Sequence, residues 1–150
     1  MKNFLIISLI IILNNCGGYE PIFSGKETNF YIQEIKNINN DKITNQVIRR
    51  LKPYTIDTNK TEIKLEIDSS SNERIVSKNA KGDPVTFELV IKVKIKIIIS
   101  EEQKFLNYVE NFSFNNQSNK FELNQYKKNI EKNLMDKIFE KLILNLKSNI

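Results

Sequence analysis

Residues 84–100, PVTFELVIKVKIKIIIS, form the longest regular pattern in this 150-residue sequence. From residue 85 to residue 99 every second side chain is apolar, which is the period of a β-strand that buries one face. At about 3.3 Å per residue this strand would run roughly 50 Å, far longer than the usual strand of about 5–6 residues. A second layer of similar length must therefore cover its apolar row: Val85, Phe87, Leu89, Ile91, Val93, Ile95, Ile97 and Ile99.

The C-terminal segment predicts that cover. From residue 123 onward, apolar residues recur at every fourth position and neighbouring apolar residues widen the stripe, so we expect an amphipathic helix of about 25 residues. At 1.5 Å per residue it would be about 37 Å long. The stripe that we expect against the long strand consists of Tyr126, Ile130, Leu134, Ile138, Leu142 and Leu146, with Met135, Phe139 and Ile143 beside it.

The N-terminal part of the domain predicts a strand, a helix and a second strand. Residues 30–38 have strand composition, and residues 60–68 alternate cleanly between apolar and polar side chains. Between them, Asn40 or Asp41 can cap a helix that ends near Pro53. In the first strand the alternation is imperfect, and we expect Phe30 and Ile32 on one face, Tyr31 and Ile35 on the other.

Residues 60–115 predict an antiparallel meander around the long strand. The polar run 69–72 predicts a loop, and residues 73–78 a short strand or the base of a hairpin. Residues 79–84, NAKGDP, have turn composition, and residues 101–104 predict a second turn. The returning strand would place on one face Leu106, Tyr108, Phe112 and Phe114.

Together these elements predict the fold class and the domain organisation. We expect an α+β two-layer sandwich, in which two helices pack on one face of a sheet of about four mostly antiparallel strands. A chain of this length has room for one modest core, so residues 30–150 are expected to form a single domain.

Composition excludes several functional classes. The chain has no His, no Trp and one Cys, which excludes a His-based catalytic triad, a His/Cys zinc site and an intrachain disulfide. No Gly-rich phosphate loop is present, so we expect no catalytic site, no metal and no cofactor. The formal charge is +5, but basic residues are dispersed among acidic ones and no nucleic-acid-binding motif occurs, so no nucleic-acid partner is expected.

The N-terminus has the features of a bacterial lipoprotein precursor. A basic start is followed by an apolar run over residues 4–13, which is too short for a membrane span of about 20 residues. The only cysteine, Cys16, follows that run and resembles the lipid-attachment site of such proteins. We therefore expect residues 1–15 to be a lipoprotein signal peptide and residues 16–29, rich in Gly and polar residues, to be a tether. The alternative is an uncleaved signal anchor with an incidental thiol.

The polar row of the long strand contains Lys92, Lys94 and Lys96, about 6.6 Å apart along the strand. One interpretation is that they keep a sheet face soluble and discourage pairing between edges. The other is that they bind the phosphates of a lipid or an acidic surface, since ammonium groups are effective partners of phosphate. The three lysines are therefore the candidate ligand-binding residues.

Several short strings resemble the LPS-assembly lipoprotein LptE family. The opening from Cys16, CGGYEPIF, is similar to the family's start, and residues 112–126, FSFNNQSNKFELNQY, look like its junction between last strand and final helix. The order of predicted elements is similar as well. The resemblance implies a lipid-anchored protein on the periplasmic side of the outer membrane. Its implied partners are the β-barrel LptD, whose lumen it fills and whose assembly it assists, and lipopolysaccharide.

A second functional class remains open. An unrelated periplasmic lipoprotein, such as a pilotin or a lipid-binding module, could share the same sandwich. Co-purification of an LptD-type barrel would distinguish the two classes.

The Cys16→Ala variant should keep its fold but lose membrane anchoring. One acyl chain holds a protein only marginally at a membrane, whereas two or three chains hold it firmly, so removing the attachment thiol removes the anchor. The measurement is membrane fractionation together with circular dichroism. A processed variant that stays in the outer-membrane fraction without a barrel partner would contradict lipidation.

Overall fold

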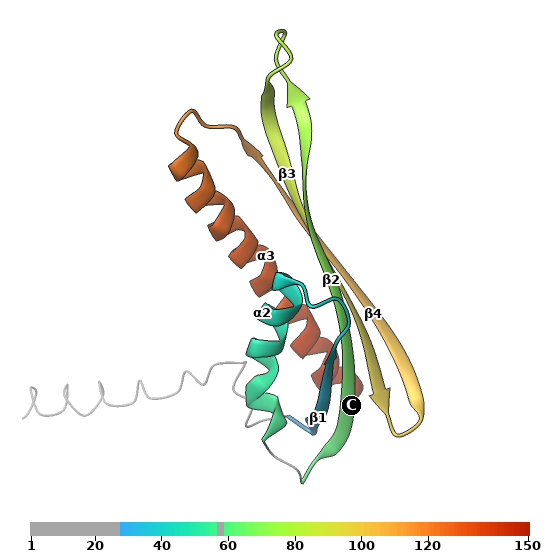
Figure 1. Ribbon diagram of the computed structural model, residues 1–150. Helices are drawn as coiled ribbons and strands as arrows, with labels where there is room; N and C mark the ends of the chain where they lie inside the picture. The colour runs from blue at the N-terminus through green and yellow to red at the C-terminus, as the bar shows by residue number, and fades with distance from the viewer. Residues whose placement is uncertain (1–27, 57–58) are drawn as a thin grey trace, which may run out of the picture.

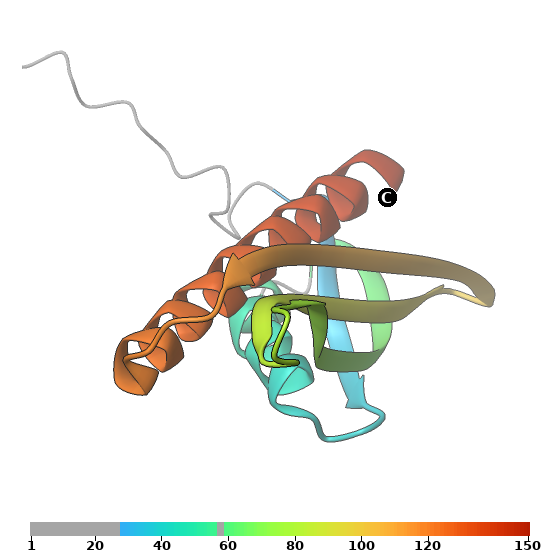
Figure 2. The same cartoon turned by 90° about the horizontal axis from the view of Figure 1, so that it is seen from above.

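The computed structural model describes residues 28–56 and 59–150. A four-stranded sheet has the order β1-β2-β3-β4, and the helices lie on one side of it (Figures 1 and 2), which confirms the predicted α+β sandwich. The elements in chain order are β1 (Phe30–Asn37), α2 (Lys42–Leu51), the 3-10 helix η2 (Lys52–Thr55), β2 (Thr61–Lys78), β3 (Pro84–Ile99), β4 (Glu102–Asn115) and α3 (Lys120–Asn149).

The sheet is built on a long antiparallel hairpin. Strand β2 pairs with β3 from Lys64 opposite Ile98 to Lys78 opposite Pro84. Strand β4 then pairs with β3 along its whole length. Strand β1 pairs with β2 in parallel, which needs a crossover connection, and α2 provides it. The predicted meander is therefore confirmed, and the single parallel pair lies at one edge.

The hydrophobic core forms between the sheet and both helices. In the long strand the residues from Leu89 to Ile97 alternate between buried and more exposed positions as predicted. The predicted stripe of α3 is buried in the same cluster. Its fully or nearly fully buried members are Leu123, Ile130, Leu134, Met135, Ile138, Leu142, Ile143 and Leu146.

Side-chain caps define where both helices begin. Asp41 accepts a hydrogen bond from the Ile43 backbone N–H, so of the two expected caps it is Asp41 that starts α2. Asn119 accepts from Phe121 and Glu122 at the start of α3. Helix α3 therefore begins three residues before the first apolar position of its stripe and reaches 30 residues, longer than the predicted 25.

The predicted loop at residues 69–72 is wrong, because these polar residues continue β2. Ser69 lies opposite Val93 in the ladder, and its side chain is buried. Its hydroxyl donates to Asp41 Oδ2 (3.2 Å) and lies 2.7 Å from Thr44 Oγ1. Backbone pairing with β3 and these side-chain hydrogen bonds satisfy the polar groups, so a run of serines can stay in a strand. Residues 73–78 belong to the same strand.

Smaller differences have local causes. A bulge between Ile32 and Glu34 shifts the register of β1, so Ile35 packs on the core side and not on the opposite face as predicted. Helix α2 ends at Leu51, close to Pro53 as predicted, and Pro53 then occupies the first turn of η2, where its missing N–H costs nothing. The turn after β3 involves Ser100 and Glu101, with Ser100 at φ 56, so β4 starts at Glu102.

The apolar row of the long strand and the apolar stripe of α3 are each more exposed near their start than in their middle. Val85 is 41% exposed and Tyr126 is 39% exposed. Figure 1 shows the reason, since the β2–β3 hairpin extends beyond the first turn of α3. The helix covers the central part of the long strand and leaves its tip uncovered.

Leu134→Ala should destabilise the protein strongly, while Lys132→Ala should have little effect. Leu134 is 2% exposed in the core and Lys132 is on the exposed side of α3. Removing a buried Leu costs roughly 2–5 kcal/mol of the free energy of unfolding, out of about 5–15 kcal/mol for a typical domain. Thermal unfolding of both variants measures this. Equally small shifts in melting temperature would show that α3 does not cover the sheet.

Candidate functional site

The three candidate lysines lie on the sheet face opposite the helices. Lys92, Lys94 and Lys96 alternate along β3 with the buried residues Val93 and Ile95. Lys92 and Lys94 are exposed, whereas Lys96 is half-buried. The arrangement is the predicted row of ammonium groups on an uncovered face.

Neighbouring acidic residues divide this row into unequal parts. Lys96 Nζ lies 3.6 Å from Glu66 Oε2, and Lys36 approaches the other oxygen of Glu66 at 3.7 Å. Lys94 is opposite Asp68 on β2. Positive charge is therefore partly balanced on the β2 side at these two positions.

Lys92 is in a different environment. Its cross-strand neighbours are Ser70 on β2 and Val109 on β4, neither of which is charged. The β4 side of the row is uncharged and partly apolar, with Val109 54% exposed and Phe105 66% exposed. An anion with an apolar part would find ammonium groups next to apolar side chains on this side.

A shallow hollow of about 360 Å³ lies at the Lys94 and Lys96 end of the row. Exposed Ile38 borders it from the β1 side. The sequence did not reveal this arrangement, because only the strand register shows which acidic residues lie beside which lysines. The lining residues are Ile38, Glu66, Asp68, Lys94, Ile95, Lys96, Phe105, Leu106 and Asn107.

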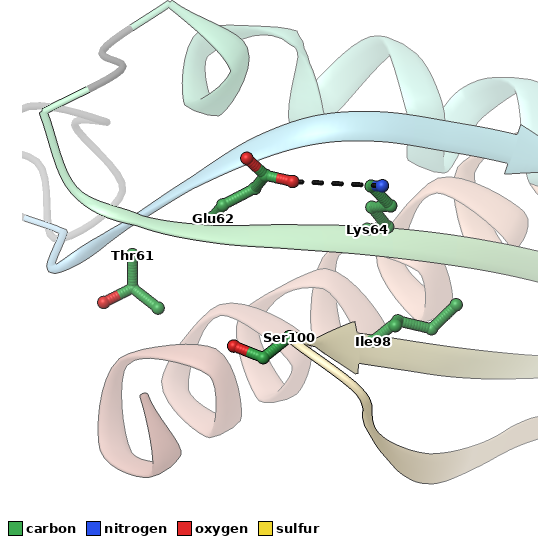
Figure 3. Close-up of a pocket in the computed structure, with 5 residues that line it drawn as sticks. All are labelled: Thr61, Glu62, Lys64, Ile98 and Ser100. Carbon is green, nitrogen blue, oxygen red and sulfur yellow. Dashed lines mark ion pairs between the residues drawn. The ribbon is translucent and has the colours of Figure 1, made fainter.

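A second hollow of about 280 Å³ lies at the end of the sheet where β2 begins and β3 ends. Figure 3 shows its lining residues, with Thr61 at the start of β2, Ser100 in the turn after β3, and an ion pair between Glu62 and Lys64. That pair is 3.9 Å long, and Glu62 also accepts a hydrogen bond from the Tyr31 hydroxyl at 2.9 Å. The charged groups of this second hollow thus have partners within the protein, which makes the hollow a weaker ligand site than the lysine row.

A third hollow is a mainly apolar groove of about 300 Å³ between β4 and α3. We call it the β4–α3 groove. Phe112 is 43% exposed here, and Lys137 contributes a charge. The complete lining consists of Phe112, Tyr126, Asn129, Ile130, Asn133, Leu134 and Lys137.

Three tyrosines have raised pKa values. Burial raises the pKa of Tyr108 to about 12, and its hydroxyl is buried without a hydrogen-bond partner among the described residues. Burial also raises the pKa of Tyr54, and the hydrogen bond to Glu62 raises the pKa of Tyr31. All three shifts move the tyrosine pKa further from 7, whereas an acid or base catalyst works best with a pKa near the pH of the reaction.

The predicted lipid-attachment residue, Cys16, lies outside the described residues, as do the predicted signal peptide and most of the tether. Within residues 28–56 and 59–150, no helix is long and apolar enough to cross a membrane. The same residues contain no group of three or more His, Cys, Asp or Glu side chains placed to hold a metal ion.

Solved structures of two bacterial lipoproteins have a similar fold. Rare lipoprotein B from Shewanella oneidensis matches with a TM-score of 0.54 and 14% identity, over 75% of this chain and 95% of that one. Uncharacterized lipoprotein B from Nitrosomonas europaea matches with a TM-score of 0.56 and 16% identity, over 87% of this chain and 91% of that one. No protein-family model matches the sequence, and no curated protein matches it. The chain therefore shares the fold of these lipoproteins across most of its length.

Proposed function

We propose that this protein is a lipid-anchored lipoprotein on the periplasmic side of the outer membrane, where it fills and supports an LptD-type β-barrel during lipopolysaccharide transport. The observation that carries the proposal is the fold shared with two bacterial lipoproteins over 75% and 87% of the chain. The lipoprotein-like N-terminus with Cys16 and the sequence resemblance to the LptE family point the same way.

The shape of the protein suits a barrel lumen. Helix α3 has 30 residues and β2 has 18, which correspond to about 45 Å and roughly 60 Å of length. A narrow, elongated body of two layers fits inside a large barrel, whose interior is polar and can be occupied by a plug. The mixed charged and apolar face of the sheet is compatible with such an interior.

The lysine row is the proposed contact for the phosphates of lipopolysaccharide. Lys92 carries this role most directly, because no acidic residue lies opposite it in the ladder. Exposed Val109 and Phe105 on β4 would lie beside acyl chains or an apolar barrel wall. Lys96 contributes less, because Glu66 already balances its charge.

Changing Lys92, Lys94 and Lys96 together to Glu should weaken lipopolysaccharide binding strongly, and most at low ionic strength, because charge attraction is screened by salt. Among single variants, Lys92→Gln should weaken binding more than Lys96→Gln. Binding to immobilised lipopolysaccharide at two salt concentrations measures both effects, and circular dichroism checks the fold. Unchanged binding of the triple variant at low salt would show that these lysines only keep the sheet face soluble and do not bind lipopolysaccharide.

A pull-down from solubilised membranes tests the proposed partner. The chain carries a C-terminal tag, and we expect a large β-barrel protein in the eluate. The Cys16→Ala variant serves as a control that separates barrel binding from membrane anchoring. An eluate without any barrel protein would favour the alternative of an unrelated periplasmic lipoprotein.

A further inference from the structure

Strand β4 is an unusually open edge of the sheet. It is the last strand in the order β1-β2-β3-β4, so along its outer side the backbone has no strand partner among the described residues. Its 14 residues pair with β3 in unbroken register. The opposite edge, β1, is only 8 residues long and is interrupted by a bulge. Short length, bulges and charged side chains protect sheet edges from pairing; β4 has neither of the first two, and its charges on the helix side are Glu102, Lys104 and Glu110.

The composition of β4 also favours pairing. The strand contains no Pro, and its aromatic and β-branched residues are typical of paired strands. Its charged residues are Glu102, Lys104 and Glu110. Exposed Phe105 and Val109 lie on the uncovered face beside the edge. An incoming strand would therefore find free backbone groups flanked by apolar side chains.

Self-pairing can be tested against the sequence of β4. When two identical strands pair antiparallel around a two-fold axis, opposite residues lie on the same face, so the axis must pass through a residue. With the axis at Asn107, Lys104 faces Glu110 of the second copy, and Phe105 faces Val109. Leu106 then faces Tyr108 of the second copy, whose aromatic ring is also apolar.

Neighbouring registers lack this complementarity. An axis one residue earlier places Glu102 opposite Glu110, and an axis through Glu110 places that carboxylate opposite itself. Axes at Tyr108 or Val109 leave Lys104 facing an aromatic side chain. Like charges directly opposite each other destabilise a strand pair, whereas opposite charges stabilise it. Among these registers the axis at Asn107 is therefore the one that the charges select.

The same register gives the β4–α3 groove an occupant. With the axis at Asn107, Glu102 of the second copy faces Phe112 on the helix side of the sheet, where Lys137 lines the groove. Glu110 already pairs with Lys141, so Lys104 of the second copy would join an existing ion pair. Figures 1 and 2 show the β3–β4 turn projecting away from the helices, which leaves the start of β4 accessible.

We propose that two copies of this chain associate through antiparallel pairing of their β4 strands, centred on Asn107, into one continuous sheet. The inference concerns the chain by itself and does not rest on the proposed role in lipopolysaccharide transport. The partner is a second copy, because its own β4 supplies the complementary charges at Lys104, Glu110 and the groove.

Cysteine crosslinking tests the register directly. In the full chain with Cys16→Ala, which removes the only native thiol, Asn107→Cys should form a disulfide-linked dimer under mild oxidation. Directly opposite residues in an antiparallel pair have Cβ atoms about 4.5–5.5 Å apart, which small backbone shifts bring within disulfide reach. The matched control is Asn111→Cys, an equally exposed Asn in the same row of β4. Its two copies would lie about 27 Å apart and should not crosslink.

Light scattering of the unmodified chain provides an independent measurement. We expect the mass of a dimer, and Lys104→Glu should weaken the dimer roughly 2- to 30-fold because two opposite-charge contacts become like-charge contacts. Lys128→Glu, the same charge change on the exposed side of α3, should leave it unchanged. A monomeric mass at all concentrations would overturn the proposal. So would crosslinking of Asn111→Cys that equals or exceeds that of Asn107→Cys.

Discussion

The antiparallel ladder between β2 and β3 is the interaction on which the rest of the structure depends. Its strands have 18 and 16 residues, so one face presents a long apolar row that cannot stay in water. Burial of apolar area is the main favourable term in folding, at about 25 cal/mol per Å². Helix α3, with 30 residues, is the element long enough to cover the middle of this row, and α2 covers the part next to β1.

The long strand and its cover were predictable because each depends on a local period. Alternation over residues 85–99 and the four-residue spacing in the final helix need no knowledge of the partner element. Asp41 and Asn119 are likewise local signals, because a cap bonds to the next turn of its own helix. The serine run in β2 was not predictable in this way. Ser69 remains in a strand only because Val93 and Asp41, both distant in sequence, satisfy its polar groups.

The candidate site shows the same division between local and tertiary information. Alternation alone places Lys92, Lys94 and Lys96 on the uncovered face, but it does not show which acidic residues lie beside them. That depends on the β2–β3 register, which brings Glu66 to Lys96 and Asp68 opposite Lys94. The row is thus not a uniform basic stripe. Acidic residues on β2 balance the positive charge at the Lys94 and Lys96 end. At the Lys92 end no acidic residue lies opposite in the ladder, so the charge can attract an anion next to the uncharged side chains of β4.

The length of the sheet also determines which of its surfaces stay open. A single helix crossing a long, twisted sheet covers only one face and only part of its length, so none of the described residues covers the hairpin tip, the lysine face or the edge of β4. The charged residues on these surfaces differ. The lysine face carries opposite charges that stabilise one another across strands, whereas β4 keeps Lys104 exposed and apolar side chains beside free backbone groups. Charge on a face maintains solubility without a partner, whereas the backbone groups of a long, bulge-free strand edge bond to water in a monomer and can pair with a second strand when one is present.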